Sequence, residues 1–285
     1  MTIMDPPAPH ATITQRLLGL APGRGAKPAL VGGAALGPGR RLSYADFGRM
    51  VQASAAGLAW HGVRSGDAVG LCAPDAASYA LAVHAIRAAG AVPSPVCGGA
   101  TATRMAQQLT DCGARILITG PPLVPLALAA VERSWVRQVI SFGDEPGTIP
   151  FGSLLSRGSL PAIRCAAAEL ALLPYDSGPG GALRPVPMTH GQLAEELLRL
   201  AARTPMTGQD VVITAPPAGE GRAYSVLVDL ALLEGATIVA TSSTGSTDAA
   251  DIADTARVYG GTAAIVHPGM PVPPGLSLRT VTAGC

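Results

Sequence analysis

The chain has 285 residues, of which 48% are hydrophobic and 14% are charged, and its formal net charge is +1. This apolar content is ample for one large or two small buried cores. Because the charge is near zero and the basic residues are scattered, we expect neither nucleic acid nor a membrane surface as a partner. No apolar run is long enough to cross a membrane, and the N-terminus lacks the layout of a signal peptide, so we expect a cytoplasmic protein.

Cysteine and lysine usage restricts the chemistry. The five cysteines are widely spaced, without a Cys-x-x-Cys pair and without histidines at ligand spacing. We therefore expect reduced, mostly buried thiols and no metal site. His61 and His84 fall within helical patterns, and we expect them at helix surfaces or boundaries rather than in a catalytic role. Lysine occurs once, at Lys27, so every other cationic side chain is an arginine.

Strand and helix patterns alternate along the first part of the chain. Ser43 and Asp75 are good helix N-caps, and Gly62 and Gly90 stand where helices should end. The predicted helices span residues 13–20, 43–60, 76–89, 101–112 and 123–132. The predicted strands span residues 28–31, 68–72, 91–96, 115–119 and 136–142. This alternation is typical of parallel strands joined by crossover helices on both faces of a sheet.

A Gly/Ser-rich connector over residues 146–166 divides the chain into residues 1–165 and 166–285. The second part repeats the alternation. Its predicted helices span residues 191–203, 224–234 and 248–259, and its predicted strands span residues 210–215, 236–241 and 262–266. We therefore expect an α/β fold with two doubly wound βα lobes.

A glycine-rich stretch, PYDSGPGGALRPVPMTH, occupies residues 174–190 after a short apolar run. Glycines allow positive φ angles and can aim backbone N–H groups inward, while a hydroxyl and a guanidinium add a donor and a fixed positive charge. Such a loop suits a phosphate group. An ordinary surface turn between a strand and a helix is the alternative. The candidate phosphate ligands are Ser177, Gly178, Gly180, Gly181 and Arg184.

The stretch resembles the phosphate-binding loop of the adenylate-forming (AMP-binding) enzymes, the superfamily of acyl-CoA synthetases and 4-coumarate–CoA ligases. Their pattern runs Tyr-Ser-Ser-Gly-Thr-Thr-Gly-x-Pro-Lys-Gly-Val-x-x-Thr-His. The positions that match without a gap are Tyr175, Ser177, Gly178, Gly181, Val186, Thr189 and His190. Shorter family motifs match in order at residues 62–67, 88–92 and 235–239. The resemblance implies an N-terminal region of this superfamily.

The departures from the family pattern fall where its chemistry takes place. Pro179 and Gly180 stand in place of the two threonines, and Arg184 and Pro185 in place of the lysine–glycine pair. Prolines at 179, 185 and 187 remove three backbone donors. Residues 217–221 replace an aromatic–histidine pair that lines the family's acyl pocket. We expect no catalytic residue here, and only weak binding of ATP or AMP with magnesium.

By the family's pattern, this chain covers only about the first half of a full enzyme. The magnesium carboxylate, the ribose-binding aspartate and the catalytic lysine lie in the later part, and Lys27 is in the wrong place to substitute. We favour a truncated, degenerate member that does not form acyl-adenylates alone and acts as a ligand-binding or partner-binding protein in a biosynthetic pathway. The alternative is one half of a split acyl- or aryl-acid–CoA ligase that is completed by a second chain.

The partners follow from the same resemblance. The family's strand at residues 278–281 continues into further strands, so we expect association at this end, either as a homodimer or with a complementing ligase half. A small carboxylic acid is the expected ligand class.

Overall fold

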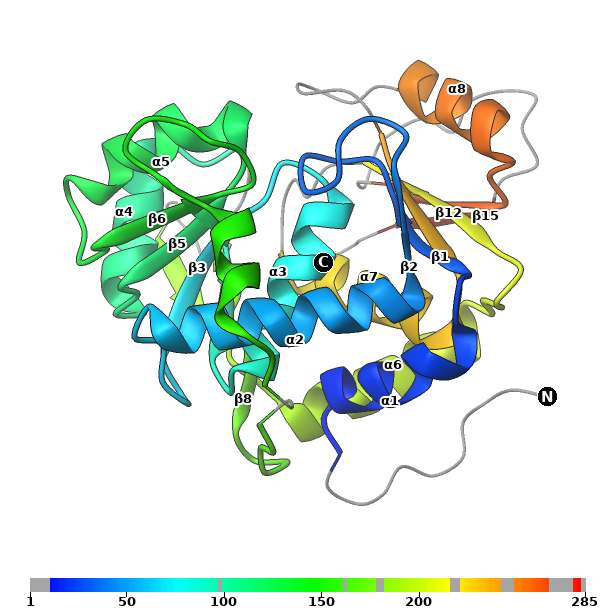
Figure 1. Cartoon of the computed structure of the whole chain (residues 1–285), viewed down its shortest axis with the longest axis horizontal. Helices are drawn as coiled ribbons and strands as arrows, with labels where there is room; N and C mark the ends of the chain where they lie inside the picture. The colour runs from blue at the N-terminus through cyan, green and yellow to red at the C-terminus, as the bar shows by residue number, and fades with distance from the viewer. Residues whose placement is uncertain are drawn as a thin grey trace.

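The computed structural model describes residues 11–96, 99–160, 163–177, 182–215, 221–241, 249–266 and 279–282. Within these residues the chain forms a five-stranded and a six-stranded sheet, here called the small and the large sheet (Figure 1). The strand order is β4-β3-β5-β6-β7 in the small sheet and β15-β14-β12-β13-β1-β2 in the large sheet. All neighbouring strands in both sheets are parallel except the pair β1 and β2.

The bounds of the elements are as follows. The small sheet contains β3 (Ala68–Cys72), β4 (Val92–Pro95), β5 (Ile116–Thr119), β6 (Gln138–Ser141) and β7 (Ile149–Pro150). The large sheet contains β1 (Pro28–Val31), β2 (Arg41–Ser43), β12 (Val211–Thr214), β13 (Thr237–Ala240), β14 (Ala263–Val266) and β15 (Arg279–Thr282). The helices are α1 (Ile13–Arg24), α2 (Tyr44–Trp60), α3 (Ala76–Ala88), α4 (Ala102–Asp111), α5 (Val124–Val131), α6 (His190–Arg203), α7 (Gly221–Glu234) and α8 (Ala249–Tyr259), with short 3₁₀ turns η1 (Pro121–Leu123) and η2 (Phe151–Arg157).

In both sheets the chain adds strands first on one side of a starting strand and then on the other. In the small sheet, β4 lies on one side of β3 and β5 on the other, with α3 and α4 as the successive crossovers. In the large sheet, β13 and β14 lie on either side of β12, with α7 and α8 as the crossovers. This is the doubly wound arrangement of α/β proteins. The predicted fold class is therefore confirmed.

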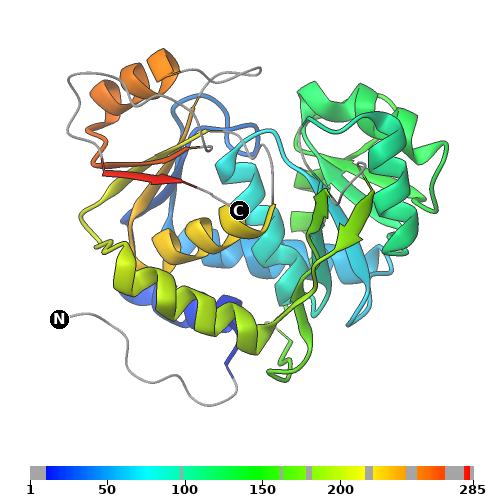
Figure 2. The same ribbon diagram turned by 180° about the vertical axis from the view of Figure 1, so that it is seen from behind.

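Helices fill the space between the sheets and cover their outer faces. All 13 residues of α3 are buried, because it contacts β3 and β4 of the small sheet as well as β13 of the large one. From behind, α6 lies along α7 (Figure 2). On the outside, α4 and α5 pack on the small sheet and α8 packs on the large sheet. Strands such as β5 and β14 are thus buried on both faces, which explains their continuous apolar runs.

Side chains alternate between the inner and outer cores. In β5, Ile116 and Ile118 belong to the core between the sheets, whereas Leu117 belongs to the core under α4 and α5. In β12, Val212 faces the inner core and Ile213 faces α8. This alternation is the period of two that a strand imposes.

The sheets do not follow the division of the chain into residues 1–165 and 166–285. Strand β1, which the sequence placed in the first lobe, pairs with β13 through Leu30 and Ile238 and through Val31 and Val239. Strand β2 follows β1 into the same sheet. The boundary after residue 165 stays a prediction, but the large sheet takes strands from both sides of it.

The predicted helix signals are found in the structure. The Ser43 hydroxyl accepts a hydrogen bond from the Asp46 N–H at 3.1 Å, and the Asp75 carboxylate accepts one from the Ser78 N–H at 2.9 Å. Gly62 and Gly90 have φ angles of 97° and 74°, a region that favours glycine. The fifth helix starts later than predicted, because Pro121 begins a 3₁₀ turn before it.

The described ranges also show the lengths of the apolar helices, the state of the thiols and the distribution of metal-ligating side chains. In the described ranges, no helix is both long and apolar enough to cross a bilayer. The cysteines that are described, Cys72, Cys112 and Cys165, are unbridged. Cys97 and Cys285 lie outside the described residues. Within those same ranges no three metal-ligating side chains gather at one point.

Candidate phosphate-binding site

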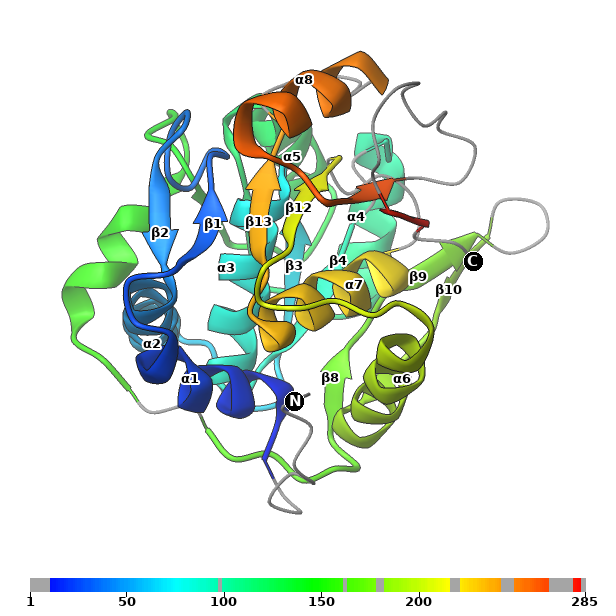
Figure 3. The same ribbon diagram turned by 90° about the vertical axis from the view of Figure 1, so that its right-hand side faces the viewer.

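The glycine-rich stretch forms a hairpin. Strand β9 (Tyr175–Ser177) pairs antiparallel with β10 (Leu183–Pro185). The strands that flank this pair in the chain, β8 (Leu170–Leu172) and β11 (Met188–Thr189), also pair antiparallel with each other. Figure 3 shows the hairpin at one side of the molecule, continuing from β8. Of the five candidate ligands, Ser177 and Arg184 are described, whereas Gly178, Gly180 and Gly181 lie outside the described residues.

The register places Ser177 and Arg184 on different faces of this hairpin. Ser177 lies opposite Leu183, and Arg184 lies opposite Asp176. Because directly opposed residues share a face and successive residues alternate, Ser177 shares its face with Tyr175, while Arg184 shares the other face with Asp176. Both Ser177 and Arg184 are exposed. The two described candidates therefore flank the loop without facing each other.

Helix α4 lies on the Ser177 face and holds the hairpin by two contacts. The Arg104 Nη2 atom donates a hydrogen bond to the Ser177 Oγ atom at 2.7 Å. The Tyr175 hydroxyl donates a hydrogen bond to the Asp111 carboxylate at the other end of the same helix. Burial, followed by this hydrogen bond, raises the pKa of Tyr175, so its hydroxyl stays protonated and able to donate.

The position of Arg104 puts the hairpin at the edge of a sheet where α/β proteins bind ligands. Helix α4 follows β4, so its first turn lies beyond the carboxyl end of that strand. Thr101 caps this turn by accepting a hydrogen bond from the Arg104 N–H at 3.3 Å. Ligands of doubly wound folds bind outside the carboxyl ends of the strands. The Ser177 end of the hairpin therefore lies on the side of the small sheet where other doubly wound folds bind their ligands.

Sequence patterns did not single out Arg104. It lies 73 positions before Ser177, and only the packing of α4 against the hairpin brings the two together. The one local signal is its place in the first turn of a helix that directly follows a buried strand.

His190 begins α6, as its place in the pattern predicted. Thr189 caps the helix and forms a capping box with Gln192. His190 is only 7% exposed, and its Nδ1 atom has no hydrogen-bond partner among the described residues. Burial and then the Arg87 charge lower its pKa to about 4. His190 is therefore a neutral core residue next to the loop rather than a cation for phosphate.

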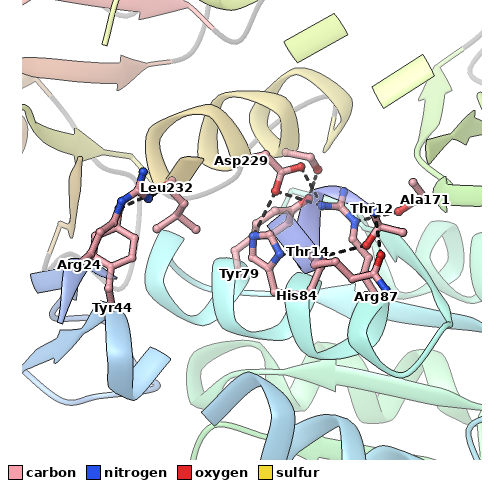
Figure 4. A network of polar contacts seen from close by, with 12 residues as sticks. Thr12, Thr14, Arg24, Tyr44, Tyr79, His84, Arg87, Ala171, Asp229 and Leu232 are labelled. Carbon is pink, nitrogen blue, oxygen red and sulfur yellow. Dashed lines mark hydrogen bonds and ion pairs between the residues drawn. The ribbon is translucent and has the colours of Figure 1, made fainter. Parts of the chain in front are cut away.

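The prediction for His84 at a helix surface or boundary was wrong. His84 is fully buried, and its two ring nitrogens lie 3.0 Å from the Thr14 hydroxyl and 3.3 Å from an Asp229 carboxylate oxygen. Arg87, one turn further along α3, donates to both Asp229 oxygens, at 3.0 and 2.7 Å, and to the Ala171 carbonyl at 2.9 Å. Figure 4 shows this network joining α1, α3, α7 and β8. By contrast, His61 caps the end of α2, as expected.

Two hollows lie beside the small sheet and α4. A pocket of about 240 Å³ lies at the amino ends of β3, β5 and β6, opposite the edge that Ser177 approaches, and its lining includes Asp67, Arg115 and Arg137. An open depression of about 430 Å³ lies on α4, with Asp111 and Arg133 in its lining. The segment expected to form the acyl-pocket wall, residues 217–221, has no described side chains.

The hairpin, the doubly wound sheets and the order of the motifs agree with a comparison against protein families. The model of the AMP-binding enzyme family matches residues 21–271, most of the chain. The chain belongs to the AMP-binding enzyme family. The predicted family is therefore confirmed, and the α/β fold matches the corresponding region of solved members.

Relatives within the AMP-binding family are longer than this chain. The feruloyl-CoA synthase of Amycolatopsis sp. is 27% identical over 205 residues, which are 70% of this chain and 39% of that protein. A long-chain-fatty-acid–CoA ligase (FadD1) from Archaeoglobus fulgidus superposes with a TM-score of 0.80 at 24% identity, over 91% of this chain and 52% of that one. Apo MbtA from Mycobacterium smegmatis gives a TM-score of 0.79 at 26% identity, over 91% and 48%. The chain thus spans about half the length of these solved relatives.

Proposed function

We propose that this AMP-binding family member binds nucleotide phosphate weakly at the β9–β10 hairpin and does not form acyl-adenylates by itself. The observation that carries the proposal is that the hairpin keeps some of the family's phosphate-binding groups and has lost others. Ser177 and Arg184 remain at its two strands, whereas Pro179 and Gly180 occupy the positions where the family pattern has two hydroxyls. A role as a binding protein in a cytoplasmic biosynthetic pathway is part of the same proposal.

The loop chemistry supports weak binding. A phosphate loop works mainly through backbone N–H groups, and each proline removes one. Prolines 179, 185 and 187 remove three such donors. Arg184 keeps a positive charge where the family has lysine, but its bulkier, planar head is not equivalent. We expect a dissociation constant for ATP on the order of millimolar, or about 4 kcal/mol of binding free energy.

Two measurements on the 285-residue chain test this proposal. Calorimetric titration with ATP should show weak binding that weakens further in Arg184→Ala and is unchanged in Arg115→Ala, which alters the opposite edge of the small sheet. Acid-dependent pyrophosphate exchange, with a panel of aryl and fatty acids, should stay at background. Exchange clearly above background would contradict the proposal, and equal ATP affinity in wild type and Arg184→Ala would remove Arg184 from the site.

A split ligase completed by a second chain is the second candidate, and the edge of the large sheet favours it. Strand β15 pairs with β14 on one side and with no described strand on the other. Uncovered strand edges pair readily with other chains. We propose this edge as the contact to a second copy or to a complementing ligase half, burying upward of about 1,000 Å² in total. Light scattering across a concentration series, with and without Leu278→Lys, tests this contact, and a monomer unaffected by the substitution would contradict it.

A further inference from the structure

We infer that Arg104 of α4 contacts the phosphate groups of a nucleotide bound at the hairpin, together with Ser177. The inference rests on the proposed function, since it concerns the same hairpin. It assigns a cation that lies far from the loop in the sequence and outside the family's phosphate-loop pattern. The ligand class is a nucleoside polyphosphate.

The hydrogen bond between Arg104 and Ser177 prepares both groups for an anion. Arginine has no acceptor, so the Ser177 oxygen accepts this bond and its own O–H proton stays available for donation. A guanidinium carries five N–H donors in a planar fork that matches phosphate oxygens in pairs. One polyphosphate can therefore meet the Ser177 hydroxyl and the Arg104 fork at the same point.

The two arginines lie on different faces of the hairpin and have different neighbours there. Arg104 approaches the face of Ser177, whereas Arg184 lies on the other face, directly across the strands from Asp176. The Asp176 carboxylate weakens the attraction of an anion to that second face. Arg104 is also partly buried, whereas Arg184 is exposed. Water therefore screens the charge of Arg104 less than that of Arg184. The Ser177 face is therefore the stronger place for a phosphate.

The acidic residue Asp111 stands near the hairpin but away from Arg104. It accepts a hydrogen bond from the Tyr175 hydroxyl at the C-terminal end of α4, about two helical turns from Arg104. The Tyr175–Asp111 bond fixes the hairpin against the helix. Tyr175 and Asp111 thus hold Ser177 and Arg104 in place relative to each other.

The test is ATP titration of the full chain, five single variants and one double variant, with Arg184→Ala among the single variants. Arg104→Gln should weaken ATP binding by about tenfold, and Arg104→Lys by less, because a point charge remains without the fork. Ser177→Ala should also weaken binding, and adding it to Arg104→Gln should cost little more, since the two groups act as one unit. The control Arg133→Gln removes a guanidinium that contacts Thr103 on α4 and should leave the affinity within about twofold.

Thermal melting of each variant checks that the fold is intact. ATP binding that survives Arg104→Gln and Ser177→Ala unchanged, yet falls in Arg184→Ala, overturns the inference and leaves the proposed function standing. An equal loss in Arg133→Gln and Arg104→Gln also overturns it, because general charge would then explain both. Failure of the wild-type chain to bind ATP at all overturns the inference and the proposed function together.

Discussion

Arg87 and Asp229 form an ion pair with almost no exposure to solvent, in the layer between the two sheets. Burial alone raises the pKa of the Asp229 carboxyl, but Arg87 and then His84 lower it overall, so the group is ionised in the folded protein. Burial lowers the pKa of His84 despite the neighbouring Asp229, so this ring is neutral at pH 7. One buried carboxylate therefore compensates one buried guanidinium.

The stability losses from removing the two partners of this pair should not be additive. Asp229→Asn leaves the Arg87 charge buried without a counter-ion, and we expect a loss of about 3–5 kcal/mol in the free energy of unfolding. The double variant Arg87→Met, Asp229→Asn should lose less than the sum of the single variants. Urea unfolding of the four proteins measures this. Additive losses, or a loss below about 1 kcal/mol in Asp229→Asn, would contradict it.

His190 should make the protein less stable in acid. Its pKa is about 4 in the folded protein, below the usual value of about 6.5, so the unfolded chain takes up the proton first as the pH falls. Stability should therefore decline as the pH drops from about 6.5 to about 4. The charges that act on the ring are Arg87, Glu169 and Asp229.

Unfolding free energies at pH 7 and pH 4.5 test this effect. The difference between the two values should be smaller in His190→Gln than in the wild type, but not zero, because His84 has the same direction of shift. A pH dependence identical in the two proteins would show that His190 does not carry it.

At the scale of elements, local signals predicted most of the fold. Caps such as Ser43 and Asp75 and helix-ending glycines are set by the nearest few residues, so the sequence shows them directly. The Arg104–Ser177 contact depends on two elements packing together, and no local pattern contains that information. His84 was misplaced because a polar residue was assumed to lie at the surface of an amphipathic helix. Helix α3 is apolar nearly all round, which is the pattern of a fully buried helix.

Two helical glycines offer a matched pair for testing how elements pack. A Cβ atom at Gly57 in α2 would lie 2.5 Å from the Cβ atom and 2.6 Å from the carbonyl oxygen of Leu154 in η2, whereas one at Gly19 in α1 would meet nothing within 4 Å. Gly57→Ala should therefore destabilise the protein by about 1–3 kcal/mol, because α2 and η2 must separate. Gly19→Ala should stabilise it by up to about 1 kcal/mol through helix propensity.

Thermal melting of the two glycine variants gives the signs of these changes. A Gly57→Ala protein that melts at or above the wild-type temperature would mean that α2 and η2 are not as close as the structure shows. Gly19→Ala serves as the control for the general effect of placing alanine in a helix.

At the scale of the whole molecule, α3 and α7 belong to both lobes at once. The inner core is one continuous cluster that includes Ile118 from the small sheet, Tyr79 from α3, Leu230 from α7 and Ile238 from the large sheet. Strands β1 and β2 also cross from the first part of the chain into the large sheet. Because α3 and α7 pack in the core between the sheets, the loss of these helices would expose the inner faces of both sheets.

The two sheets should therefore unfold together, although each has the winding of a separate domain. Hydrogen exchange measured by mass spectrometry across a urea series should show peptides from β5 and β12 becoming labelled in one transition. Ile118→Ala in β5 creates a cavity in the shared core and should lower the urea midpoint of both peptides equally. Leu117→Ala, on the outer face of the same strand under α4 and α5, is the control for a change confined to one lobe's outer core. If β12 keeps its wild-type midpoint while β5 shifts in Ile118→Ala, the lobes are independent units and α3 does not couple them.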